Sequence, residues 1–141
     1  MQAQGTGEAT TPFSIGVATR IAAALLVLII GAIHAYETPA QYSSLHYLGI
    51  LFAANFVGGL IAAVGIYRDK PWGWVLGIVV AGGAFAAYAI TRSVGLPQDT
   101  GDIGNWGEPL GVVSLIAEGG FVLLALATIP MWARRTGRGS V

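Results

Sequence analysis

The sequence lacks cysteine and has very little charge. The absence of cysteine excludes disulfides, thiolate metal ligands and cysteine nucleophiles. Charged residues make up only 10% of the 141 residues and hydrophobic residues make up 55%, which lies outside the usual range of soluble globular domains. The net charge of +0 leaves no basic surface to neutralise phosphates, so nucleic acid is excluded as a partner.

The few charges border four long apolar stretches. No charged residue occurs between Thr38 and Tyr67, or between Pro71 and Thr91. A bilayer core of about 30 Å takes roughly 20 apolar residues as helix, because unpaired backbone cannot cross it otherwise. The sequence therefore predicts an all-α membrane protein, a bundle of four transmembrane helices at about 13–36, 43–67, 72–92 and 109–132. We expect the first to be retained, since no basic residue precedes Arg20 and no A-x-A-like cleavage site follows.

The basic residues predict the orientation of this bundle. Positive residues of short loops stay in the cytoplasm. Six of the seven fall on one side and only Arg92 falls on the other, which puts both termini in the cytoplasm and the chain in the cytoplasmic (inner) membrane. We expect a flexible cytoplasmic N-terminus at 1–12, one domain at 13–132 and a basic cytoplasmic tail at 133–141. The six shared basic residues are Arg20, Arg68, Lys70, Arg134, Arg135 and Arg138.

Small residues recur at the four-residue spacing that lets helices approach closely in lipid. Gly73 and Gly77 form one stripe on the third helix, and Gly58 begins another on the second. Asn55 falls on the same small face as Gly58. We interpret these residues as structural, with the amide of Asn55 bonded to a neighbouring helix.

Four ionisable residues lie toward the outer half of the predicted bundle: His34, His46, Arg92 and Glu118. Buried charges are ordinarily paired, so one interpretation is an Arg92–Glu118 ion pair with interfacial histidines. A second is an organic or lipid ligand held by Arg92 and Glu118, with Glu108 and Trp106 of the 93–108 loop as its cover.

Two further interpretations of the same region require a cofactor. His34, Glu37 and His46 offer imidazole and carboxylate ligands for a divalent metal such as zinc, or for copper or iron. Two histidines on adjacent helices suit axial ligation of haem. One observation argues against the metal and the haem interpretation. At 100° per residue, His46 lies about 180° around its helix from Asn55 and the small-residue face, so it is expected to point away from the bundle centre.

Several short motifs are shared with a group of membrane proteins. Thr91-Arg92-x-x-Gly95-Leu96-Pro97 is followed by Glu108-Pro109-Leu110-Gly111, with Trp106 before it and Ser114-Leu115 and Glu118 after it. Together with His34 near Glu37 and with Asn55, this pattern resembles small four-helix bacterial membrane proteins that have no assigned function. The resemblance implies the four-helix fold and points to Arg92, Glu108 and Glu118, but it implies no activity.

The sequence favours a binding or accessory protein over an enzyme. None of its serines lies in a G-x-S-x-G context or beside an evident base. We therefore expect a non-catalytic protein that binds a small ligand. The alternatives are a metal- or haem-dependent redox protein, and an obligate subunit whose small-residue stripes contact another membrane protein or a second copy of the chain.

Overall fold

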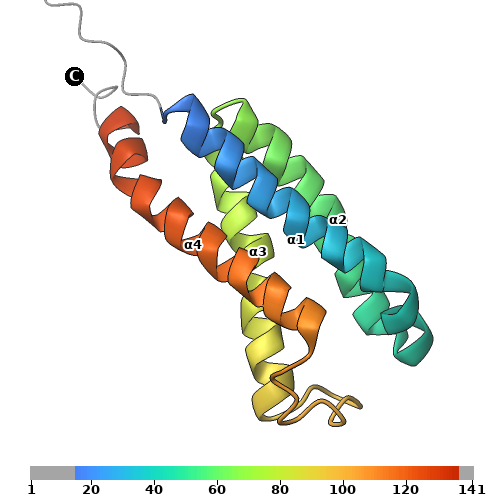
Figure 1. Cartoon of the computed structure of the whole chain (residues 1–141). Coiled ribbons are helices and arrows are strands. Elements are labelled where there is room, and N and C mark those ends of the chain that lie inside the picture. The colour runs from blue at the N-terminus through green and yellow to red at the C-terminus, as the bar shows by residue number, and fades with distance from the viewer. Residues whose placement is uncertain (1–14, 137–141) are drawn as a thin grey trace, which may run out of the picture.

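The computed structural model describes residues 15–136, and the side chains of residues 15–131. The described chain forms four helices, α1 (Val17–Ser44), α2 (His46–Tyr67), α3 (Pro71–Ser93) and α4 (Pro109–Thr136), as Figure 1 shows. The fold class is therefore all-helical, as predicted. The predicted cytoplasmic segment 1–12 and residues 137–141 of the predicted tail lie outside the described residues, whereas residues 133–136 continue α4.

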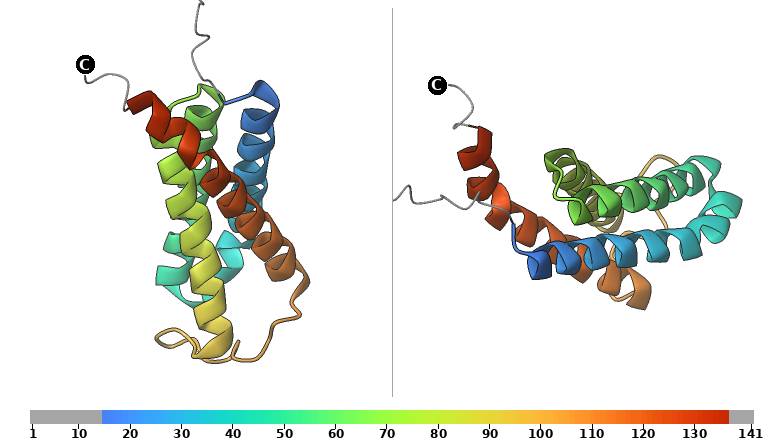
Figure 2. Two further views of the ribbon diagram at one scale, coloured as in Figure 1. Left: turned by 90° about the vertical axis from the view of Figure 1, so that its left-hand side faces the viewer. Right: turned by 90° about the horizontal axis from the view of Figure 1, so that it is seen from above.

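The helices are arranged up and down, with each one packed against the next and with α4 returning to α1. Residues 68–70 connect α2 to α3 at one end, which we name the turn end; α1 begins there and α4 ends there. Leu45 and residues 94–108 lie at the opposite end, named the loop end. The α1–α2 hairpin leans away from α3 toward the loop end, so the bundle is wider there (Figures 1 and 2).

All four helices are long and apolar enough to cross a membrane. The shortest, α2, has 22 residues, or about 33 Å at 1.5 Å per residue, which exceeds a hydrocarbon core of about 30 Å. Large apolar side chains cover the outside of the bundle, and Leu123 and Ile116 are 71% and 70% exposed. Such a surface is suited to lipid.

Helix α1 is longer than the sequence predicted. The expected connection beginning near Glu37 is wrong, because α1 runs through Pro39 to Ser44 and only Leu45 separates it from α2. Pro39 removes one backbone donor, which usually ends a helix. Here the Thr38 hydroxyl donates to the His34 carbonyl at 2.7 Å and adds a bond across the same turn.

The turn end is closely packed. A Cβ on Gly73 would contact the backbone of Gly65 and Ile66, and a Cβ on Gly65 would lie 2.7 Å from the Cα of Gly73. Backbone therefore meets backbone where α2 turns into α3, as the small-residue stripe predicted. Beside this contact Trp74 is 1% exposed and forms a buried core with its neighbours.

Two other glycines of the predicted stripes also face neighbouring helices. Gly77 lies against the ring of Phe121 on α4, and a Cβ on Gly58 would lie 2.9 Å from Val80 on α3. The helices are thus held close along the turn-end half, and the space between them increases toward the loop end.

Candidate functional site

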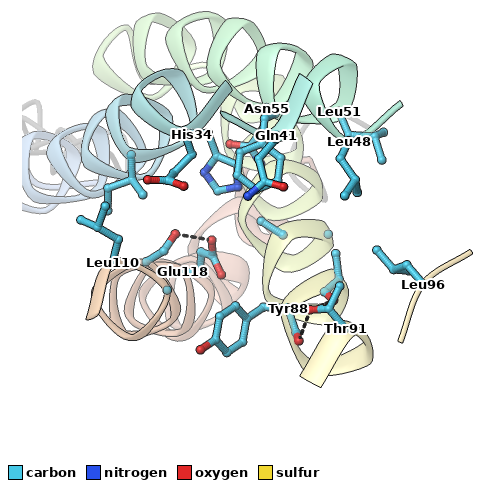
Figure 3. Close-up of a pocket in the computed structure, with 18 of the residues that line it drawn as sticks. His34, Gln41, Leu48, Leu51, Asn55, Tyr88, Thr91, Leu96, Leu110 and Glu118 are labelled. Atoms are coloured by element: carbon cyan, nitrogen blue, oxygen red, sulfur yellow. Dashed lines mark hydrogen bonds between the residues drawn. The ribbon is translucent and has the colours of Figure 1, made fainter. Parts of the chain in front are cut away.

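A cavity of about 470 Å³ occupies the loop-end half of the bundle. All four helices and the 94–108 loop contribute to its wall, which is mostly apolar (Figure 3). Its polar lining includes six of the residues that the sequence singled out: Glu108 of the loop and, on the helices, His34, Glu37, Asn55, Arg92 and Glu118. The cavity is the candidate site.

Glu118 is the most deeply buried charged side chain of the cavity, with 2% exposed. It lies nine residues after Pro109, about 14 Å along α4. Ser114, one turn earlier, donates its hydroxyl to Oε1 at 2.7 Å, whereas Oε2 is buried and has no hydrogen-bond partner. Burial of a polar atom without a partner costs free energy, so this oxygen is a candidate contact for a ligand.

The Arg92–Glu118 ion pair, one of the interpretations that the sequence left open, does not form. The Arg92 guanidinium is 2.7 Å from an Asp102 carboxylate oxygen and 3.1 Å from Glu108 Oε2. It also lies over the Tyr88 ring, 4.6 Å from the ring centroid, in a cation–π arrangement. Asp102 and Glu108 both belong to the 94–108 loop. They lie closer to Arg92, at the end of α3, than Glu118 does deep in α4.

Arg92 therefore fastens the loop to the bundle. Its carbonyl accepts a bond from Gly104 N–H at 2.9 Å, so both its backbone and its side chain hold the loop. On the far side of the cavity the Tyr47 hydroxyl of α2 donates to the Pro97 carbonyl at 2.7 Å. The loop is thus attached to both halves of the widened end.

His34 lies on α1 with 8% of its surface exposed. Its Nδ1 is 2.9 Å from the Ile30 carbonyl, and since a carbonyl only accepts, Nδ1 carries the proton in this bond. The neutral ring then presents Nε2 as an acceptor. Phe52 of α2 contacts the ring with centroids 4.7 Å apart, which holds the imidazole against the α2 wall.

The structure does not assemble the proposed metal ligands. His34 and Glu37 line the cavity, but His46 does not, and its exposed ring packs on Tyr42 at a centroid distance of 4.6 Å. Among the described residues, no three histidine, aspartate or glutamate side chains are grouped to hold a metal ion. The geometry gives no support to the metal or haem interpretation.

Asn55 makes the predicted bond to a neighbouring helix, with Nδ2 donating to the Val80 carbonyl of α3 at 3.1 Å. Its Oδ1 is buried without a partner, and the residue lines the cavity. Asn55 therefore contributes an acceptor to the candidate site as well as a structural bond.

Trp106 lies outside the cavity lining and is 48% exposed. Its ring makes an edge contact with Tyr88 at 6.2 Å, and its carbonyl is 3.4 Å from the Tyr88 hydroxyl. Trp106 therefore packs on Tyr88 and, contrary to the expectation from the sequence, does not cover the cavity.

Sequence reasoning missed several lining residues of the site, and Tyr88, Gln41 and Phe52 are three of them. Tyr88 lies four residues before Arg92, one helical turn away, and this spacing could have identified it. Gln41 lies seven residues, or two turns, after His34, but the expected end of the first helix hid that relation. Phe52 carries no comparable signal, because aromatic residues on an apolar helix are common.

Chemically, the cavity can hold a molecule with an apolar body and a small polar group beside Glu118, Asn55 and His34.

The resemblance to small four-helix bacterial membrane proteins stays a prediction. Comparison with protein-family models, with curated proteins and with solved structures finds no match to this chain.

Proposed function

We propose that this chain is an integral protein of the cytoplasmic membrane that binds a small amphipathic ligand in the loop-end cavity, without catalysing its conversion. The observation that carries the proposal is Glu118, whose unpartnered Oε2 is buried beside a cavity of about 470 Å³. A carboxylate deep in a transmembrane helix is costly and typically has a functional role. Because Arg92 is engaged by Asp102 and Glu108, no described cation neutralises this oxygen from within the bundle, which supports a ligand as its partner.

The proposed orientation has both termini in the cytoplasm and the cavity facing the outer side. Its support is the positive-inside rule applied to Arg20, Arg68 and Lys70 at the turn end, against Arg92 alone at the loop end. A cysteine can be introduced without background, since the chain has none. Labelling of intact cells with a membrane-impermeant thiol reagent should modify Gly101→Cys but not Asp69→Cys. The reverse pattern would refute this orientation.

Binding can be tested with three probes that share one apolar body: phenylbutylamine, phenylbutyrate and phenylbutanol. We expect at least one to raise the unfolding temperature of the protein in nanodiscs, because a ligand that binds only the folded state stabilises it. The control is Gly83→Phe. Gly83 lines the cavity and has no atom within 4 Å of an added Cβ, so a ring can be introduced there to narrow the cavity without an initial clash.

Stabilisation of the wild-type protein that is lost in Gly83→Phe supports the proposed function. Two results would contradict it: none of the three probes shifts the unfolding temperature, or the shifts are the same in Gly83→Phe.

A further inference from the structure

We infer that the ligand is an organic cation, a protonated amine attached to an apolar body, and that Glu118 is its counter-ion. This inference rests on the proposed function and specifies its ligand class. The first observation is the charge of the cavity wall. Five carboxylates line it against the single guanidinium of Arg92, which is a formal charge of −4 with His34 neutral. The five are Glu37, Asp99, Asp102, Glu108 and Glu118.

This charge is unevenly compensated. Arg92 is bound to Asp102 and Glu108 at the loop, and its remaining face is covered by the Tyr88 ring. No cation among the described residues is paired with Glu118, which is the most buried of the five carboxylates. A site of this kind attracts cations and repels anions, and the effect is strong where water is scarce.

The hydrogen-bonding groups agree with the charge. Three groups without a described hydrogen-bond partner line the deep part of the cavity, Glu118 Oε2, Asn55 Oδ1 and His34 Nε2. The unpartnered donor Arg92 Nε lies at the loop, and Gln41 adds an amide of both kinds. The three deep groups are all acceptors, with His34 in the tautomer fixed by Ile30. They come from α4, α2 and α1 and surround one part of the cavity, as Figure 3 shows. A primary ammonium group has three donors and no acceptor, which complements this set.

The rest of the wall selects an organic cation over a bare metal ion. Most of the remaining lining surface is apolar, with Phe52, Leu48 and Leu51 from α2 and Leu110 from α4 among its members. Hard divalent ions take six or more oxygen ligands in a compact cage. The described residues hold no group of three metal-ligating side chains, whereas the apolar wall can bury a hydrocarbon body.

The experiment compares the three phenylbutyl probes by the shift in unfolding temperature in nanodiscs of zwitterionic lipid. We expect phenylbutylamine to stabilise the wild-type protein, and we expect phenylbutyrate and phenylbutanol to have little effect. Phenylbutyltrimethylammonium keeps the charge but loses all N–H donors. It should therefore bind more weakly than the primary amine.

Two matched variants separate the role of Glu118 from general attraction to acidic residues. Glu118→Gln keeps the shape of the side chain and an acceptor for Ser114 but removes the charge. It should weaken binding of the amine at least tenfold, about 1.4 kcal/mol. Asp69→Asn removes a carboxylate at the turn end, and asparagine tolerates the positive φ of 56° there. It should leave amine binding unchanged.

The possible results are distinguishable. If phenylbutanol or phenylbutyrate stabilises as well as the amine, or if the amine binds Glu118→Gln undiminished, the inferred ligand class is wrong while the proposed binding function stands. If Zn²⁺ alone stabilises the protein and the amine does not, the cavity binds a metal and the inference fails. If no probe has any effect, both proposals fail. The selectivity among probes is measured on the wild-type protein, so the inference stays testable even where a variant does not fold.

Discussion

Replacement of Gly73 by alanine tests the packing that holds the turn end together. The added methyl group would lie 2.5 Å from Ile66 N and 2.6 Å from Gly65 Cα, whereas ordinary contacts begin at 3.4 Å. The opposing atoms are backbone and cannot move aside by changing rotamer. Helices α2 and α3 must therefore separate by about 1 Å, which loses dispersion contacts along their shared face.

The magnitude follows from a comparison with Gly82→Ala on the same helix, where the new methyl group meets only Val122 Cγ2 at 3.9 Å. Both changes gain the same helix propensity, about 1 kcal/mol at most, so this contribution cancels. Overpacking costs about 1–3 kcal/mol, and the free energy of unfolding of Gly73→Ala should be lower than that of Gly82→Ala by this amount.

The assay is reversible unfolding by SDS titration in detergent micelles, followed by tryptophan fluorescence and by the loss of helical circular dichroism. Gly65→Ala should show a similar loss, and the double variant should lose less than the sum of the two, since the helices need to separate only once. Equal stability of Gly73→Ala and Gly82→Ala would refute the close backbone contact.

Two further predictions concern the loop end. Arg92→Met leaves Asp102 and Glu108 without their cation. Because these carboxylates are 40% and 38% exposed, water can hydrate them. The free energy of unfolding should therefore fall by about 1–2 kcal/mol, less than the 3–5 kcal/mol lost when a fully buried pair is broken. Amide hydrogen exchange should accelerate in residues 94–108, and an equal acceleration in all helices would contradict the role of Arg92 as the loop fastener. Tyr47→Phe removes one exposed hydrogen bond to Pro97 and should cost about 1 kcal/mol or less. Exchange should rise only near Pro97, and an unchanged rate there would show that this bond does not restrain the loop.

The sequence was sufficient to predict the four helices, because the cost of placing charge or unpaired backbone in lipid leaves a simple pattern. The predicted ends at 67 and 92 and the predicted starts at 72 and 109 differ from the structure by at most one residue. The predicted starts at 13 and 43 and the predicted end at 132 differ by three or four residues, and the largest difference is the end of α1, expected at 36 and found at Ser44. Pro39 removes only the one backbone bond to the carbonyl of Ala35, so the helix can continue around it, and the sequence alone does not show that it does.

The residues of the site were found more readily than their partners. Glu118, His34 and Asn55 stood out because polar groups are rare on apolar helices, and all three line the cavity. The partner of Arg92 was misassigned because it depends on the path of an irregular loop. Positive φ angles at Gly95 and Gly104 direct that loop back over the end of α3, which brings Asp102 and Glu108 to the guanidinium.

The tight contact between Gly65 and Gly73 also determines how a molecule can travel. Trp74, Ile66 and Phe121, each at most 1% exposed, fill the interior beside it. The shallow hollow formed by Val17, Arg20 and Tyr67 shares no residue with the large cavity. In the described part of the bundle this packed core closes the large cavity toward the turn end. The cavity of one copy therefore has a solid floor at mid-bundle, and the turn-end face is separated from it by buried side chains.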